Sequence, residues 1–144
     1  MQTKTPKQVS QEWVAAYNNR DSFALIELYA DDAEVEQVAF NAPPLIGRAA
    51  LLTSFVEFFR AFPDNYTDPE NIFVDGEWAM IEWSGGGTFT GNMGETPPTG
   101  KSFKLRGCGF FHIVAGKIRF QRGYFDKYTW FDQIGVPIPP SVIS

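Results

Sequence analysis

The alternation of apolar and polar positions is most regular between Lys101 and Gly135. Two runs typical of β-strands, Lys101–Val114 and Lys117–Phe125, flank the dipeptide Ala115-Gly116. Because glycine permits the positive φ angle of a two-residue hairpin turn, the pattern predicts a long antiparallel hairpin. Both of its faces are largely apolar, so we expect helices to cover one face and a second subunit to cover the other.

The register of this hairpin assigns each side chain to a face. The two-residue turn pairs Val114 with Lys117, and counting back along the strands places Cys108 opposite Gly123. One face should then carry Cys108, Phe110, Gln121, Gly123 and Phe125. The other face should carry Leu105, Phe111, Ile113, Ile118, Phe120 and Tyr124.

Apolar residues at helical spacing predict three helices in the first half of the chain. The first begins at Thr5, which has Pro6 at the first helical position and a capping-box spacing to Gln8. Asp21 should cap a short second helix. A third helix is expected at Arg48–Phe62, and a strand at Ala33–Val38 should precede it.

The second half of the chain has the pattern of a β-meander. Strands at Asn71–Val74 and Glu77–Ser84 should be joined by a turn at Asp75-Gly76, and the glycines at 85–87 should interrupt the second strand. A short helix at Tyr128–Ile134 and a proline-rich tail at 137–144 follow the long hairpin. This order predicts a single α+β domain over residues 1–144, with its core at about 9–136 and helices gathered on one side of a curved, mostly antiparallel sheet.

Composition narrows the classes of partner. The 144 residues suit one domain with a real core, and aromatic residues make up 16% of them, which favours an aromatic-lined interior or cavity. A net charge of −5 without a basic cluster argues against nucleic acid and anionic membranes as partners. One cysteine excludes an internal disulfide, and no segment is long and apolar enough for a membrane span or a signal core. We therefore expect a cytoplasmic protein.

Several short segments, in their order and spacing, resemble one known family. They are YADDAEVE, PPLIGRAAL, PPTGK, VAGKI and RGYFD…QIGV. These segments resemble the SnoaL-like polyketide cyclases of the wider nuclear transport factor 2-like (ketosteroid isomerase-like) superfamily, over about Val9 to Val136. The resemblance implies a cone-shaped roll, in which a bent sheet wraps around about three helices and encloses one deep apolar pocket. It also implies a homodimer through the outer face of the sheet.

The resemblance can be carried to the catalytic positions only one residue at a time. The acid/base Asp of the cyclases lies six residues after the lysine of VAGKI, and that position is Gly123. The position of their helper His is Gly109, whereas the first-helix tyrosine and the third-helix polar residue match Tyr17 and Ser54. The resemblance therefore implies that the catalytic pair is missing while part of the pocket wall is kept.

Two related enzyme groups fail the same test. The general base of ketosteroid isomerases would fall on Gln37, and their oxyanion-hole residues would fall on Trp13 and Cys108. Limonene-type epoxide hydrolases use an Arg and two Asp residues, and those positions hold Trp83, Gly85 and Gly123. Each reaction needs a carboxylate in an apolar cavity, and neither glutamine nor glycine can titrate. The residues thus argue against the known chemistries of the superfamily.

Three other residues could carry chemistry, but each has a simpler structural explanation. Asp126 is expected to cap the terminal helix, with Thr129 in the first turn, rather than to act as a catalytic acid. His112 is the single histidine and lies near the hairpin turn, so a surface or hydrogen-bonded role is favoured and a metal site is not expected. Cys108 could be a nucleophile, but a buried inert thiol is the commoner case.

The residues expected to line the pocket come from helices and strands alike. They are Trp13, Tyr17, Gln37, Ser54, Phe55, Phe58, Trp83, Cys108, Phe110, Gly123 and Phe125. Aromatic residues at these spacings are also typical of a plain core. The sequence favours a protein that holds a small apolar molecule, cyclic or polyketide-like, without a cofactor. It leaves open both a non-catalytic binding module and a cyclase, isomerase or dehydratase with a non-standard residue set such as Tyr17, Gln37, Ser54 and Cys108.

Overall fold

The computed structural model describes residues 2–137 and has the predicted α+β fold. Its helices are α1 (Pro6–Asn18), α2 (Ser22–Ile26), α3 (Arg48–Ala61) and α4 (Lys127–Ile134), with a 3-10 turn, η1 (Val38–Phe40). Its strands are β1 (Tyr29–Gln37), β2 (Leu45–Ile46), β3 (Tyr66–Asp75), β4 (Trp78–Thr88), β5 (Ser102–Val114) and β6 (Lys117–Phe125). The predicted proline-rich tail lies, apart from Pro137, outside the described residues.

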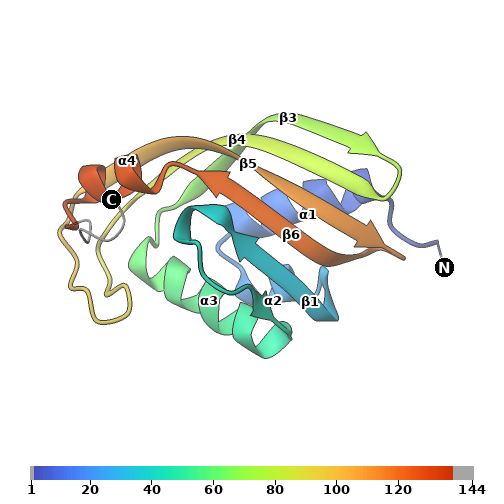
Figure 1. Ribbon diagram of the computed structural model, residues 1–144, viewed down its shortest axis with the longest axis horizontal. Helices are drawn as coiled ribbons and strands as arrows, with labels where there is room; N and C mark the ends of the chain where they lie inside the picture. Colours follow the sequence, from blue (N-terminus) through green and yellow to red (C-terminus); the bar gives the residue numbers. More distant parts are fainter. Residues whose placement is uncertain (1, 138–144) are drawn as a thin grey trace.

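The six strands form one curved sheet in the order β2-β1-β6-β5-β4-β3. Neighbouring strands are antiparallel except for the parallel pair β1 and β6, so the sheet is mixed. The long strands β3–β6 arch over the N-terminal helices, and α4 lies at the end of the sheet where β6 finishes (Figure 1). No helix within residues 2–137 is long and apolar enough to cross a membrane.

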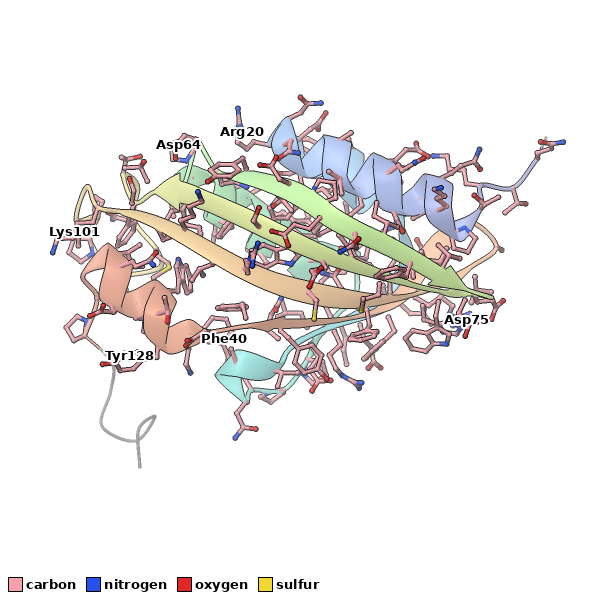
Figure 2. The ribbon with its side chains drawn as sticks, turned by 90° about the horizontal axis from the view of Figure 1, so that it is seen from above. Arg20, Phe40, Asp64, Asp75, Lys101 and Tyr128 are labelled. Atoms are coloured by element: carbon pink, nitrogen blue, oxygen red, sulfur yellow. The ribbon has the colours of Figure 1, made fainter. Side chains whose placement is uncertain are left out.

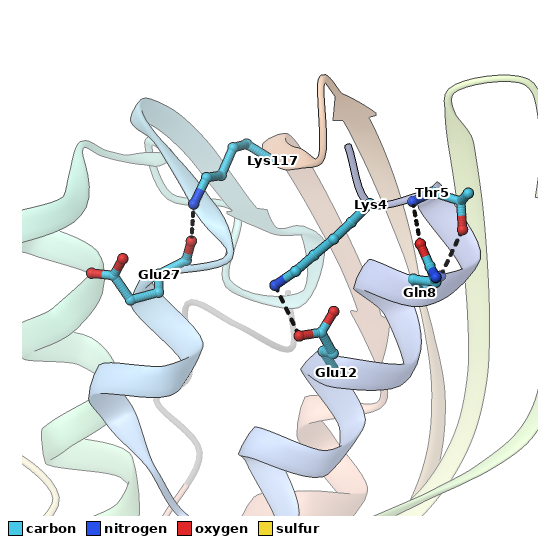
Figure 3. Close-up of polar contacts among 6 residues, drawn as sticks. All are labelled: Lys4, Thr5, Gln8, Glu12, Glu27 and Lys117. Carbon is cyan, nitrogen blue, oxygen red and sulfur yellow. Dashed lines mark hydrogen bonds and ion pairs between the residues drawn. The ribbon is translucent and has the colours of Figure 1, made fainter. Parts of the chain in front are cut away.

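Side-chain caps start three of the helices as the sequence predicts. Thr5 Oγ1 accepts a hydrogen bond from the Gln8 amide at 3.1 Å, and Gln8 Oε1 accepts one from the Thr5 amide at 2.8 Å (Figure 3). The carboxylate of Asp21 accepts from the amide of Ala24, and that of Asp126 accepts from the amide of Thr129. Each cap satisfies an amide that the first helical turn leaves without a partner.

The turn between β5 and β6 is the predicted two-residue turn, but the strand register beyond it differs from the prediction. Ala115 and Gly116 have φ angles of 51° and 78°, as such a turn requires. A β-bulge follows, in which Ile113 pairs with Ile118 and His112 pairs with Phe120, so Arg119 is an extra residue on β6. The predicted register is therefore wrong by one residue from this point onward.

The bulge moves several side chains to the opposite face. Gly123 faces Gly109 rather than Cys108, and Cys108 faces Tyr124. The inner face of this hairpin carries Leu105, Gly107, Gly109, Phe111, Ile113, Ile118, Gln121, Gly123 and Phe125. The outer face carries Arg106, Cys108, Phe110, His112, Phe120, Arg122 and Tyr124.

The β3–β4 hairpin also differs from the prediction. Its turn is Gly76-Glu77, because Asp75 already pairs with Trp78. The glycines at 85–87 do not interrupt β4, and the irregularity lies on β3 between Pro69 and Asn71. Instead, these glycines permit close contact between strands. A Cβ atom at position 85 would lie 2.6 Å from the carbonyl oxygen of Tyr66.

Two groups of buried side chains form the core. One packs α1, α2 and α3 against the sheet and includes Val9, Leu25, Leu51, Ile81 and Ile118. The other lies under α4 and includes Phe62, Phe89, Leu105, Trp130 and Ile134. Phe58 and Trp83 pack against both groups. They lie on the wall of a cavity that both groups border.

Candidate functional site

A cavity of about 440 Å³ lies between the inner face of the sheet and the helices. Helix α1 contributes Trp13 and Tyr17 to its wall, α3 contributes Ser54, Phe55 and Phe58, and α4 contributes Trp130. The sheet supplies most of the remaining wall. Phe40 and Leu45 are wall residues that are also exposed, so they lie at the rim. Phe40 packs against Phe125 and Trp130, toward the α4 end of the molecule (Figure 2).

Most residues that the sequence assigns to a pocket border this cavity. They are Trp13, Tyr17, Gln37, Ser54, Phe55, Phe58, Trp83, Gly123 and Phe125. Cys108 reaches the edge of the wall, but its strand position belongs to the outer face, opposite Glu82. Phe110 is wrongly assigned: it is on the outer face and meets Tyr124 edge to face, with ring centroids 6.0 Å apart. The bulge at Arg119 is absent from the predicted register and accounts for both differences.

Among the described residues, none that lines the cavity is an Asp, Glu, His, Lys or Arg. The polar groups of the inner wall are neutral hydroxyls and amides, supplied by Tyr17, Gln37, Ser54, Asn65, Thr67 and Gln121. Within residues 2–137 there is also no cluster of three His, Cys, Asp or Glu side chains that could hold a metal ion. The wall can therefore orient a bound molecule by hydrogen bonds but offers it no charged partner.

The side chain of Gln37 fills the space beside Gly123 on the cavity wall. The two residues are direct partners in the parallel β1–β6 register. A Cβ atom at position 123 would overlap Oε1 of Gln37 and would lie 3.0 Å from its Cδ. The amide of Gln37 thus fills the space into which a longer side chain at position 123 would project. The position that the resemblance assigns to an acid is filled by a neutral amide from the adjacent strand.

A buried hydrogen-bonded chain reaches the cavity wall at Trp13 and Gln121. Nε1 of Trp13 donates to the hydroxyl of Tyr29 at 3.0 Å, and that hydroxyl donates to Oε1 of Gln121. The three residues come from α1, β1 and β6. Burial raises the pKa of the Tyr29 phenol, and burial also raises the pKa of the Tyr17 phenol on the same wall. Both phenols therefore stay protonated at physiological pH and cannot serve as bases.

Gln121, which lines the cavity, and its partner Tyr29 are both missing from the residues that the sequence predicts for the site. A signal for Gln121 exists, since an amide at an inward position of an apolar strand must find a hydrogen-bond partner. Tyr29 gives a weaker signal, because it lies at the end of the predicted second helix and before the expected strand. In the structure β1 begins at Tyr29 itself, which turns its side chain into the core.

Two further polar atoms are buried on the cavity wall. Asn65 is 1% exposed and Trp130 is 7% exposed. Oδ1 of Asn65 and Nε1 of Trp130 have no hydrogen-bond partner within residues 2–137. The backbone of Asn65 is fixed, because Nη1 of Arg20 donates to its carbonyl oxygen at 2.9 Å. Both atoms are available to water or to a bound molecule.

The remaining candidate residues lie outside the cavity. Asp126 caps α4 as predicted, and hydrogen bonds from Thr129 hold the pKa of its carboxyl below the usual range. His112 stacks on Trp78, with ring centroids 4.7 Å apart, and pairs with Glu77. Burial, followed by the charge of Glu82, raises the pKa of the Cys108 thiol, which disfavours a nucleophilic thiolate. None of these groups brings acid–base chemistry to the inner wall.

Solved structures with the same fold include proteins of several descriptions. A provisionally assigned polyketide cyclase from Xanthomonas campestris pv. campestris has 21% sequence identity and a TM-score of 0.80, covering 90% of this chain and 96% of that one. A Catenulispora acidiphila protein with a ketosteroid isomerase-like fold, in complex with trimethylamine, has 19% identity and a TM-score of 0.76, covering 93% and 96%. A phenazine biosynthesis-related protein from Pseudomonas aeruginosa has 18% identity and a TM-score of 0.73, covering 93% and 90%.

At these identities the solved structures establish the fold. Membership of a family rests on the sequence itself, because the profile of the family described as "SnoaL-like polyketide cyclase" matches residues 7–134. That match includes α1 from its second residue onward, every strand of the sheet and α4. The chain belongs to the SnoaL-like polyketide cyclase family.

Proposed function

We propose that this protein binds a small, neutral, mostly apolar molecule in the cavity, without the Asp and His chemistry of its relatives. The observation that carries the proposal is the wall itself, which is aromatic and has no charged side chain among the described residues. A volume of about 440 Å³ lies within the range of small-molecule sites. A charged ligand would lose its hydration without gaining a charged partner, which favours a neutral one.

The position of Gly123 supports binding without proton transfer. The family's acid would lie here, but the wall presents Gly123 with the Gln37 amide packed over it. Neither group titrates at physiological pH, and the phenol of Tyr17 on the cavity wall stays protonated. The cavity therefore lacks a general base among its wall residues, and family-type proton abstraction should run near the background rate.

The alternative function is a cofactor-independent cyclase, isomerase or dehydratase with a non-standard residue set. Membership of the cyclase family favours it, and so do the hydroxyl and amide groups of Tyr17, Gln37 and Ser54 on the wall. Cys108 is a weaker member of this set, because its strand position faces away from the cavity. Such an enzyme would act by orienting and polarising its substrate rather than by moving a proton to a carboxylate.

A second part of the proposal concerns the outer face of the sheet. Phe73, Trp78, Phe110 and Tyr124 are exposed there, next to Met80 and Phe120. Exposed aromatic side chains that gather on one face are typical of a protein–protein contact. We propose that a second copy of the chain covers them in a homodimer. Phe111, which the predicted register puts on the same face as Phe120, is instead buried on the inner side.

Binding and turnover can be tested separately. Fluorene, a neutral tricyclic hydrocarbon, should quench tryptophan fluorescence saturably at one site per chain, and fluorene-2-carboxylate should bind more weakly because of its charge. Exchange of the α-hydrogens of 1-tetralone in heavy water should proceed at the rate of the buffer alone. A bell-shaped pH profile for that exchange would favour the catalytic alternative, and the absence of any saturable binding would refute the proposal.

A further inference from the structure

The chain of Trp13, Tyr29 and Gln121 has a fixed direction. An indole N–H can only donate, so the hydroxyl oxygen of Tyr29 is the acceptor in its contact with Trp13. The second contact of that hydroxyl is with Oε1 of Gln121, and because a carboxamide oxygen can only accept, the hydroxyl donates its proton there. Because burial keeps the Tyr29 phenol protonated, this direction holds at physiological pH.

This direction also fixes the carboxamide of Gln121. Its oxygen is turned toward Tyr29, so its NH₂ group must point elsewhere. Gln121 is buried and lies on the cavity wall, and the one hydrogen bond of its side chain within residues 2–137 is the contact of Oε1 with Tyr29. The fold therefore presents an oriented and unused hydrogen-bond donor to the cavity. A donor held in this way needs a partner that the cavity contents supply.

The geometry points to Gln121 Nε2 as the donor that binds a carbonyl oxygen of the ligand, with Tyr29 and Trp13 as positioning residues. This inference rests on the proposed binding function and names the ligand class, a neutral polycyclic or aromatic ketone. A carbonyl fits this donor directly, because its oxygen only accepts and Nε2 only donates. A ligand hydroxyl would also bring a proton of its own, which needs a separate acceptor.

Aromatic rings around the donor suit a flat ligand. Tyr17 stacks on Trp13 with centroids 4.9 Å apart, and Phe111 meets Trp13 edge to face at 5.2 Å. Phe55 lies against Tyr29 at 5.7 Å. These rings provide apolar surfaces close to the amide, so a planar ketone can pack against them while its oxygen reaches Nε2.

The test compares 9-fluorenone with fluorene, which differ only by a carbonyl in place of a methylene group. The wild type should bind fluorenone about 3- to 10-fold more tightly than fluorene, as one added neutral hydrogen bond predicts. Gln121→Met keeps the approximate volume but removes the donor, so it should abolish this preference while fluorene still binds. Tyr29→Phe frees the carboxamide to rotate and should reduce the preference only in part.

An infrared measurement supplies a second readout. The stretch of ¹³C-labelled carbonyl in bound fluorenone should lie at lower frequency in the wild type than in Gln121→Met, because a hydrogen bond weakens the C=O bond. Gln11→Met makes the same chemical change on the exposed side of α1 and should leave both the preference and the frequency unchanged. Fluorene binding reports in every variant whether the cavity is intact. Should Gln121→Met fail to fold, the wild-type preference and Tyr29→Phe still test the inference.

Three results would contradict the role of Gln121, and one of them would also contradict the proposed function. Equal affinity of the wild type for fluorenone and fluorene would overturn the inference while leaving the proposed function standing. The same would follow from a carbonyl frequency that is unchanged by Gln121→Met. If neither compound bound, the proposed function itself would fail, and the inference would fail with it.

Discussion

The two faces of the sheet are both rich in aromatic residues, yet they differ in charge and in glycine. The outer face combines its exposed rings with ion pairs, such as Arg106 with Glu70 and Arg122 with Glu36, each at 3.0 Å. The cavity wall on the inner face has no charged side chain among the described residues. Hydrophobicity alone therefore does not distinguish a cavity from a contact surface, whereas the placement of charge does.

Glycine lets other side chains pack directly onto the backbone of the inner face. A Cβ atom at position 107 would lie 2.5 Å from Cζ2 of Trp83 and 2.6 Å from the carbonyl oxygen of Tyr124. The indole of Trp83 thus lies directly over Gly107, its partner in the β4–β5 register. On the outer face, the neighbouring position carries the side chain of Cys108 opposite Glu82. Neighbouring positions on the same strand should therefore respond very differently to substitution.

The largest expected effect on stability is at position 107, in comparison with position 108. Gly107→Ala should lower the free energy of unfolding by about 2–3 kcal/mol, because the added methyl group must displace both the indole and the adjacent backbone. Cys108→Ala, one residue along, should change it by less than about 1 kcal/mol. Urea unfolding of the two variants measures the difference. Equal destabilisation would contradict the assignment of the two faces.

A somewhat smaller effect is expected for Gly123→Asp. The new side chain would overlap the Gln37 amide and place a carboxylate in a neutral cavity, at a cost of about 1–3 kcal/mol in unfolding free energy. Burial should raise the folded-state pKa of this Asp, so the destabilisation should grow as pH rises from about 4 through the raised pKa. Combination with Gln37→Ala should recover part of the loss. Urea unfolding at several pH values measures both effects. Strictly additive effects of the two substitutions would contradict the contact between Gln37 and position 123.

The outer face should determine oligomeric state. Trp78→Ser should weaken self-association about 10-fold or more, because a large aromatic ring would leave the contact. Phe73→Ser, on the neighbouring strand, should act in the same direction. Sedimentation equilibrium measures the association constant, and cavity binding of fluorene serves as a control that should not change. A wild-type protein that stays monomeric at high micromolar concentration would refute the homodimer.

The smallest effect is expected for Asp126→Asn at the cap of α4. Hydrogen bonds from Thr129 depress the pKa of this carboxyl, so its contribution to stability is present above the unfolded pKa of about 3.9 and is lost as pH falls through the lower folded value. The variant should therefore show a flatter decline of melting temperature in acid. Ligand affinity should not change, because the cap lies outside the cavity wall. An unchanged acid decline would argue against the cap as a source of stability.

Local chemistry explains which features could be predicted from the sequence. The caps at Thr5, Asp21 and Asp126 and the turn at Ala115-Gly116 depend on residues within a few positions of one another. The bulge after the turn leaves no such mark in the sequence. One extra residue on β6 moved Phe110 and Cys108 to the outer face, because side chains alternate with a period of two.

Long-range pairing explains what the sequence could not indicate. The chain from Trp13 through Tyr29 to Gln121 joins residues on three elements that are far apart in the sequence. Its existence depends on the parallel register of β1 and β6, which no local pattern specifies. Gln37 illustrates the same point. It was expected on the pocket wall, but its contact with Gly123 became visible only once the two strands were paired.

The central claim is that the ligand binds in the cavity. The four tryptophans test it most directly, because three line the cavity and one lies outside it. Trp13, Trp83 and Trp130 are on the wall, whereas Trp78 is on the outer face beside His112. Their indole N–H signals in a ¹⁵N–¹H correlation spectrum can be assigned with single Trp→Phe variants and followed during titration with fluorene. The account predicts saturable shifts for the three cavity signals and an unchanged signal for Trp78. A shift of Trp78 with unchanged cavity signals would place the ligand on the outer face and contradict it.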